Sequence, residues 1–261
     1  MAFQTYSNGD TYDGDLRYGV KHGEGTFTWA ASGNVYTGAW VDGAQTGEGT
    51  KTYAASGDVY TGAWVDGART GEGTFTWASG NVYTGTFVED TRTGEGTFTW
   101  AGSGNVEKGT FLNGNLNGQG TKTYAASGDV YTGAWVDGAR TGEGTFTWAS
   151  GNVYTGTFVE DTRTGEGTFT WAGSGNVEKG TFLNGNLNGQ GTKTYAASGE
   201  VYTGAWVDGA RTGEGTYNYA NGNSYTGSFL NNIRDGEGTY TWANGDVYLG
   251  TFKAGNYNGQ G

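Results

Sequence analysis

The amino-acid sequence repeats itself every 23 or 24 residues along its whole length. A Gly-x-Gly pair marks each repeat, from Gly23 and Gly25 to Gly259 and Gly261. A longer period lies on top of this spacing, because residues 49–128 are identical to residues 120–199. The identity ends where Asp129 is matched by Glu200. Periods of this length are typical of tandem supersecondary units, and the long identity indicates recent duplication or deliberate design.

Each repeat alternates between two kinds of residue in a way that predicts two β-strands. In 82–88, Tyr83, Gly85 and Phe87 share one face, and in 94–100 the shared face carries Gly94, Gly96, Phe98 and Trp100. Strict alternation is the signature of a strand. Residues 89–92 (EDTR, or DGAR in sister repeats) form the predicted hairpin turn, and clusters such as ASGN form the return turn. An aromatic content of 15% argues against disorder. We therefore expect the 54 glycines to be required at particular positions of a folded structure.

Pairing these strands about the predicted turn gives a specific register. Tyr83 is expected opposite Phe98, Gly85 opposite Gly96, and Phe87 opposite Gly94, and likewise Trp64 opposite Gly71. A Gly–Gly pair leaves bare backbone on which neighbouring rings can lie, as aromatic residues cover glycines in other sheets. The same alternation puts all ten tryptophans on this face and mainly Thr, Val and Ala on the other.

The predicted fold is all-β: a single-layer, twisted antiparallel β-meander of about 22 strands, elongated and built from tandem hairpins. One repeat array is expected to span 1–261, with a partial unit at 1–11 and an incomplete last unit. Hairpin units are expected to begin near residues 12, 36, 60, 83, 107, 131, 154, 178, 202, 225 and 248. Because the sequence stops at Gly259-Gln260-Gly261, inside a unit, we expect a fragment, a trimmed chain or a design. An open sheet edge there favours end-to-end self-association.

The repeat resembles the MORN repeat, in which Tyr-x-Gly-x-Trp/Phe is followed by Gly-x-Gly-Thr and a glycine-containing return turn. The resemblance is carried by residues 36–40 with 47–50 and by each later unit up to 248–252. It implies a single-layer twisted sheet with an aromatic-lined groove. It also implies a scaffold linked to protein–protein contact, dimerisation or membrane-associated assembly.

Composition excludes most catalytic and metal chemistry. The chain has no Cys and only one His, His22, so it has few of the side chains that form a catalytic nucleophile–base pair. The acidic residues recur once per repeat, which is typical of a solvated edge, and the turns lack the dense Asp/Asn spacing of calcium loops. We therefore expect no enzyme activity, no cofactor and no metal. The net charge of −12 disfavours nucleic acid and anionic lipid as partners. With neither signal peptide nor membrane-spanning run, we expect a cytoplasmic protein.

Charged residues are predicted at two kinds of position. Six hairpin turns are each expected to hold one arginine: Arg69, Arg92, Arg140, Arg163, Arg211 and Arg234. There the arginine would pair with acidic residues of the same exposed turn or, less favourably, bind lipid. On the aromatic face, Glu107 is expected opposite Lys122 and Glu178 opposite Lys193, as groove charge pairs that set the register of the sheet or of a bound peptide. Lys51 breaks this logic, because it faces Tyr36.

The aromatic face is the strongest candidate binding site, because exposed aromatic strips mark interaction surfaces. The candidate groove comprises Tyr83, Phe87, Phe98, Trp100, Tyr131, Trp135, Phe146, Trp148, Tyr154, Phe158, Phe169 and Trp171. We expect a non-enzymatic scaffold whose groove holds a protein or peptide partner, such as an amphipathic helix, or a second array. Two alternatives stay open: a purely structural or engineered repeat without a ligand, and ice binding through Thr-x-Thr rows on the opposite face.

Overall fold

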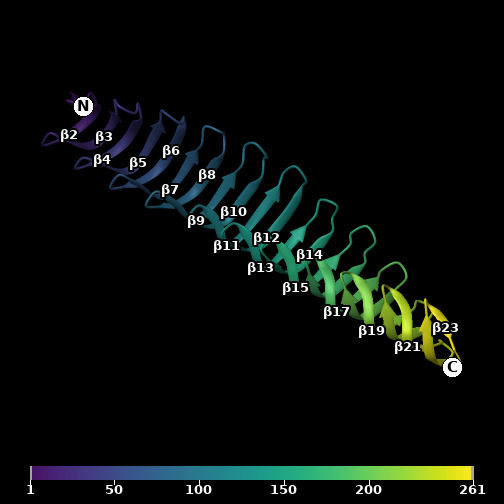
Figure 1. Ribbon diagram of the computed structural model, residues 1–261. Helices are drawn as coiled ribbons and strands as arrows, with labels where there is room; N and C mark the ends of the chain where they lie inside the picture. The colour runs from purple at the N-terminus through teal and green to yellow at the C-terminus, as the bar shows by residue number, and fades with distance from the viewer. Residues whose placement is uncertain (1, 260–261) are drawn as a thin grey trace. The chain divides into compact units, whose positions relative to one another are not determined.

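The computed structural model describes residues 2–259, and these form β-strands joined by turns (Figure 1). The last predicted Gly-x-Gly pair, Gly259 and Gly261, lies partly outside the described residues. The strands are β1 (Ala2–Thr5), β2 (Thr11–Arg17), β3 (Val20–Thr28), β4 (Val35–Val41), β5 (Ala44–Tyr53), β6 (Asp58–Val65), β7 (Ala68–Thr76), β8 (Val82–Val88), β9 (Thr91–Thr99), β10 (Val106–Leu112), β11 (Asn115–Tyr124), β12 (Asp129–Val136), β13 (Ala139–Thr147), β14 (Val153–Val159), β15 (Thr162–Thr170), β16 (Val177–Leu183), β17 (Asn186–Tyr195), β18 (Glu200–Val207), β19 (Ala210–Asn218), β20 (Ser224–Leu230), β21 (Ile233–Thr241), β22 (Val247–Lys253) and β23 (Asn256–Asn258).

The strands belong to two compact units, one of residues 2–128 and 135–138 and the other of residues 129–134 and 139–259. In the first unit consecutive strands from β1 to β11 pair antiparallel, and in the second unit consecutive strands from β13 to β23 do the same. No helix occurs between residues 2 and 259. The prediction of an all-β antiparallel meander is confirmed, with 23 strands against about 22 expected.

The core of most hairpins is a tyrosine ring lying on a pair of glycines. Gly85 pairs with Gly96, and Tyr83 pairs with Phe98, as predicted. A Cβ added at Gly96 would overlap the Tyr83 ring, so only glycine fits there. Tyr83 is completely buried, and its hydroxyl donates to the Thr86 carbonyl at 3.2 Å. The same completely buried tyrosine recurs at Tyr12, Tyr36, Tyr60, Tyr131, Tyr154, Tyr202 and Tyr225.

The second buried ring of each repeat joins it to the preceding one. Phe87 makes edge-to-face contacts with Tyr83 of its own hairpin, at 5.3 Å between centroids, and with Tyr60 of the hairpin before, at 5.0 Å. Where a tryptophan takes this position, its indole also donates to a backbone carbonyl of the preceding repeat, as in Trp64 to Gly49 at 3.1 Å. Aromatic pairs of this geometry add stability beyond the area they bury.

The predicted hairpin turn and the register beside it are wrong. Val88 pairs with Thr91, so the turn contains two residues, Glu89 and Asp90, rather than the four of 89–92. Both have positive φ, 44° and 67°, as a type I′ turn requires, and this turn matches the right-handed twist of paired strands. Phe87 consequently lies opposite Arg92, not Gly94. The same shift puts Trp64 opposite Arg69 instead of Gly71.

A bulge absorbs the residues that the shorter turn releases. Between the pairs Gly85–Gly96 and Phe87–Arg92, one residue of β8 faces three residues of β9. Gly94 lies in this bulge with a φ of +98°, which a residue with a side chain rarely adopts. The bulge therefore keeps the glycine pairs in register and moves the arginine out of the turn and into the strand.

The return turns of successive repeats are tied together by side-chain oxygens. Asn81 Oδ1 accepts a hydrogen bond from the Ala101 amide at 2.9 Å, and Asp58 Oδ1 accepts one from Ala78 at 2.8 Å. Asp129 binds Ala149 in the same way at 2.8 Å. At the position where the long repeat identity ends, the Glu200 carboxylate instead accepts from the Tyr217 hydroxyl at 2.8 Å. The longer side chain of Glu200 and the hydroxyl of Tyr217, which stands in place of Phe146, thus replace a backbone link with a side-chain link.

The tyrosine–glycine contact predicts the effect of a single methyl group. Gly96→Ala places its Cβ inside the Tyr83 ring and should destabilise the chain by about 1–3 kcal/mol, the usual cost of overpacking. The midpoint of urea unfolding, followed by tryptophan fluorescence, measures the effect. Gly102→Ala is the matched control, because a Cβ there meets no atom within 4 Å. Equal midpoints for the two variants would contradict this account of the glycine pairs.

Candidate functional site

The structure divides the twelve predicted groove residues into buried and accessible rings. Nine are buried, with exposed fractions between 0% and 8%: Tyr83, Phe87, Phe98, Tyr131, Trp135, Phe146, Tyr154, Phe158 and Phe169. Trp148 is half-buried, whereas Trp100 and Trp171 are 40% and 39% exposed. The buried rings are the core of the sheet, so a partner can reach this face only through the remaining ones.

In each unit the accessible rings lie in a row next to the return turns, and we name these rings together the outer aromatic row. Every member is half-buried or exposed: Trp29, Tyr53, Trp77, Trp100, Tyr124, Trp148, Trp171, Tyr195, Tyr219 and Trp242. Each tryptophan of the row is backed by a phenylalanine or tyrosine two residues before it. Trp100 lies 4.4 Å from Phe98 and Trp171 lies 4.4 Å from Phe169 between ring centroids.

The tryptophans outside this row have a different environment. They are buried, with exposed fractions of 3% or less: Trp40, Trp64, Trp135 and Trp206. The indole of Trp40 donates to the Gly25 carbonyl at 3.0 Å, and the others donate to equivalent glycines. Alternation places both kinds of tryptophan on one face, but only the position along the strand decides which of them solvent reaches.

The arginines occupy the aromatic face rather than the exposed turns, so their predicted placement is wrong. The Arg92 guanidinium carbon lies 5.0 Å from the Phe98 ring centroid, 5.3 Å from Trp77 and 5.4 Å from Tyr83. The cause is the two-residue turn, which draws each arginine into the strand. Stacking on rings stabilises a guanidinium by cation–π attraction, while burial lowers the pKa of Arg92.

Arginines were predicted to pair with acidic residues of their own turn, but Arg69 and Arg140 instead pair with an aspartate of the next hairpin. Arg69 Nε lies 2.8 Å from Asp90 Oδ1, and Arg140 Nε lies 2.8 Å from Asp161 Oδ1. Arg69 also donates its backbone amide to Asp90 Oδ1 at 3.1 Å. Burial raises the pKa of Asp90, but the hydrogen bonds and charge of Arg69 outweigh it and hold the pKa below its ordinary value. These bonds join neighbouring hairpins at the turn edge.

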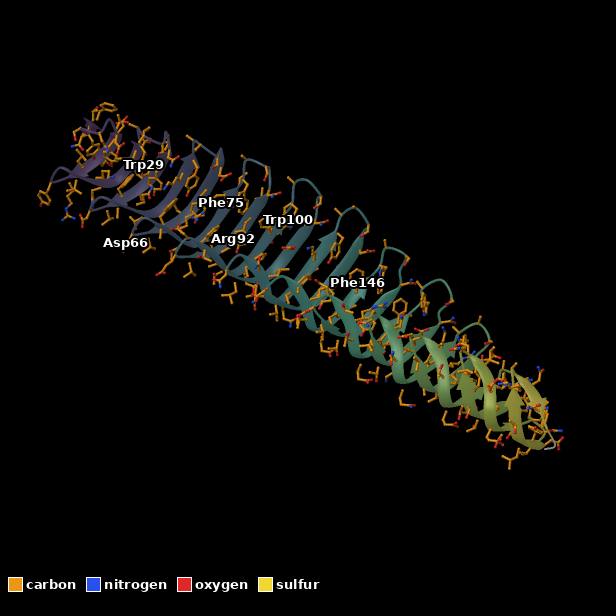
Figure 2. All side chains as sticks on the ribbon, in the orientation of Figure 1. Trp29, Asp66, Phe75, Arg92, Trp100 and Phe146 are labelled. Carbon is orange, nitrogen blue, oxygen red and sulfur yellow. The ribbon has the colours of Figure 1, made fainter. Side chains whose placement is uncertain are left out.

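Hollows open between the arginines and the outer aromatic row, as can be followed from Phe75, Arg92 and Trp100 in Figure 2. One hollow of about 320 Å³ is lined by Arg69, Phe75, Trp77, Phe87, Asp90 and Arg92, among others. The next, of about 410 Å³, includes Trp77, Arg92, Phe98, Trp100, Glu107 and Leu116. In the second unit, equivalent hollows of about 370 Å³ and 270 Å³ are flanked by Trp148 and Trp171.

The structure brings together both predicted charge pairs. Lys122 Nζ lies 2.9 Å from Glu107 Oε1, and Lys193 Nζ lies 2.8 Å from Glu178 Oε1. Only 22% of the Lys122 side chain and 15% of the Glu107 side chain are exposed. Each pair replaces the Tyr–Phe cross-strand pair of other repeats, and Glu107 lines the hollow beside Trp100.

Lys51, which faces Tyr36 rather than a carboxylate, lies instead among aromatic rings. Its Nζ is 4.9 Å from the Trp29 ring centroid and 5.2 Å from that of Tyr53. Burial lowers the pKa of Lys51. No sequence pattern marked the ring contacts of Lys51, because they depend on how each repeat packs against the next.

Burial raises the pKa of Tyr83 to about 12, so the Tyr83 hydroxyl remains a donor at neutral pH.

No arrangement for metal binding or membrane crossing is found in the described part of the chain. Across residues 2–259, no three His, Asp or Glu side chains gather to hold a metal ion. Over the same residues, no helix has the length and apolar character to cross a membrane.

Comparison with known families identifies the repeat. Eleven consecutive segments match the family model described as MORN repeat: residues 12–33, 36–57, 60–82, 83–104, 108–128, 131–153, 154–175, 179–199, 202–224, 225–247 and 248–261. The chain belongs to the MORN-repeat family. No curated protein sequence matches this MORN array.

Solved structures to which the MORN array is similar share little sequence with it. The wild-type TCP10 domain of Danio rerio CPAP, solved in complex with a peptide of Danio rerio STIL, is 12% identical, with 96% of this chain and 98% of that chain covered and a TM-score of 0.46. The SAS-4 (dCPAP) TCP domain of Drosophila melanogaster, solved with a proline-rich motif of Ana2 (dSTIL), is 14% identical, with 70% and 85% covered and a TM-score of 0.29. Likenesses of this size carry no argument about what the array binds.

The Glu107–Lys122 pair predicts opposite outcomes for a single and a double substitution. Glu107→Gln leaves the half-buried Lys122 without its carboxylate and should cost about 1–2 kcal/mol. Glu107→Tyr with Lys122→Phe restores the ring pair seen at Tyr83 and Phe98 and should equal or exceed native stability. Urea unfolding of the three proteins compares them. A double variant less stable than the single one would show that the charges are required by the fold.

Proposed function

We propose that this MORN array is a non-enzymatic scaffold that binds a segment of a protein partner along the outer aromatic row. The observation that carries the proposal is the exposure of Trp100 and Trp171, at 40% and 39%, beside open hollows on a face whose rings outside the outer aromatic row are mostly buried. Exposed tryptophans in a row are the residues that most often dominate binding energy at protein interfaces.

The outer row is held ready for binding. Trp77 packs on Phe75 at 4.6 Å and on Phe98 of the next hairpin at 5.2 Å, so its ring is fixed from behind and from one side. A ring that is already ordered loses little conformational entropy when a partner covers it. Each hollow beside the row can accept an apolar side chain, and Arg92 or Arg163 at its wall can donate hydrogen bonds to a partner's carbonyl oxygens.

A protein segment fits this face better than a membrane surface. The guanidiniums lie over rings inside hollows, where a partner's side chain can reach them but a flat array of lipid headgroups reaches them poorly. The net charge of −12 repels an anionic bilayer as a whole. An amphipathic helix, whose apolar side chains recur on one face, is the occupant whose shape suits a row of repeated hollows.

We propose no second function for the threonine face. Its hydroxyls bond to each other, as in Thr74 and Thr84 at 3.0 Å, and to carboxylates, as in Thr86 to Glu72 at 2.7 Å. In several repeats a carboxylate beside the threonines interrupts the regular hydroxyl array that ice binding needs.

Site-specific photo-crosslinking tests the proposal. With p-benzoylphenylalanine in place of Trp100, irradiation in a lysate of the source cells should give one or a few crosslinked proteins. Val88, which is 47% exposed on the opposite face, is the matched control position and should give none of them. Trp77→Ala, Trp148→Ala and Trp171→Ala together should reduce the crosslink at position 100 without unfolding the chain, as judged by circular dichroism. Identical products from positions 100 and 88, or none from either, would leave the purely structural reading.

A further inference from the structure

The hollow beside the outer aromatic row occurs three times with the same plan. Two arginines from successive hairpins flank it, three aromatic rings line it, and one Asp or Asn lies between the arginines. In the first two copies the arginines are Arg69 with Arg92 and Arg140 with Arg163. In the third they are Arg211 and Arg234, in a hollow of about 310 Å³.

The first two copies carry their own carboxylate. Asp90 Oδ1 lies 2.8 Å from Arg69 Nε, and Asp161 Oδ1 lies 2.8 Å from Arg140 Nε. Each of these hollows therefore has one of its two guanidiniums neutralised from within.

The third copy has Asn232 where the others have aspartate. Asn232 Oδ1 accepts from the Arg211 backbone amide at 3.0 Å and from Arg211 Nε at 3.3 Å, and its carbonyl accepts from Arg211 at 2.9 Å. The amide thus reproduces the bonds that position the arginine but supplies no negative charge. The third hollow is one unit of charge more positive than its two sister sites.

The neighbouring carboxylates are engaged elsewhere. Glu200 accepts from the Tyr217 hydroxyl at 2.8 Å. Asp235 binds Lys253 at 3.2 Å and the Ala254 amide at 3.1 Å. Arg234 donates one bond, to the Gly255 carbonyl at 2.7 Å, although a guanidinium has five N–H groups. Both arginines of this hollow therefore keep free donors, and within residues 2–259 neither forms an ion pair with a carboxylate.

The walls of the hollow strengthen the attraction for an anion. The Arg211 guanidinium carbon lies 5.1 Å from the Tyr217 ring centroid, and that of Arg234 lies 5.3 Å from Tyr240. Rings hold the two guanidiniums in place and exclude water from one side, and charge-assisted hydrogen bonds are stronger where water is partly excluded. Planar guanidiniums match the two oxygens of a carboxylate.

We propose that the Arg211–Arg234 hollow is a carboxylate-binding site that receives an Asp or Glu side chain of a protein partner. It gives the otherwise repetitive aromatic face one unique position, so a bound segment has a defined register and direction. The biological occupant rests on the proposed partner binding, but the affinity of the hollow for a carboxylate can be measured by itself.

The test uses the full chain and N-acetylglutamate amide as the probe, with N-acetylglutamine amide as its uncharged control. Arginine Nε–Hε signals are followed by NMR. Saturable shifts are expected at Arg211 and Arg234 with the glutamate probe alone. Asn232→Asp, which restores the aspartate of the first two copies, should weaken the binding by about tenfold or more. Asp161→Asn, which introduces the asparagine of the third copy, should create new saturable shifts at Arg140 and Arg163.

Three results would overturn the inference: no saturable shift, equal shifts in Asn232→Asp, or no gain in Asp161→Asn. If the glutamate probe gives no response but the protein sediments with phosphatidylserine vesicles, the hollow is a lipid site instead. Loss of the probe response with crosslinking at position 100 intact removes only the carboxylate site. Loss of crosslinking with an intact probe response removes only the proposed partner function.

Discussion

A tyrosine ring lying on two facing glycines is the contact on which the structure depends. A single-layer sheet has no second layer to bury its side chains against, so its core must be built on its own surface. The missing Cβ atoms of Gly85 and Gly96 provide the space, and Tyr83 fills it while its hydroxyl satisfies the Thr86 carbonyl. Phe87 then packs edge-to-face on this tyrosine and on Tyr60 of the preceding hairpin. Each repeat is thereby joined mainly to its neighbours, which makes the stability of the array a sum of local terms.

The same construction produces the candidate site. Rings over and beside the glycine pairs are buried, but the row nearest the return turns is only partly covered, by neighbouring rings and basic side chains, and its members keep up to 40% of their surface. The two-residue turn adds charge to this apolar row, because it moves Arg92 and its equivalents from the edge onto the rings. Duplication makes most hollows alike. In the third, Asn232 replaces the aspartate seen at Asp161, and Tyr217, Tyr219 and Ile233 replace Phe146, Trp148 and Thr162.

The sequence predicted the parts of the fold that follow from spacing alone. The period and the alternation predicted the Tyr83–Phe98 and Gly85–Gly96 pairs, the antiparallel meander and the glycine strip under the rings. They failed at Phe87, because a type I′ turn at Glu89 and Asp90 needs positive φ at two residues other than glycine, which composition does not reveal. They also failed to separate Trp135 from Trp171. Both lie on the aromatic face, but burial depends on the rings of adjacent repeats, and that packing is a property of the assembled sheet.

The division of the aromatic face into a buried core and an accessible row is tested most directly by hydroxyl-radical footprinting with mass spectrometry. The account predicts fast oxidation of Trp100 and Trp171, which are 40% and 39% exposed, and strong protection of Trp40, Trp64, Trp135 and Trp206, which are exposed by 3% or less. The tryptophans share one chemistry, so a difference in rate reports access to solvent. Similar oxidation rates for the two groups would contradict the account, because no separate row would then exist for a partner to bind.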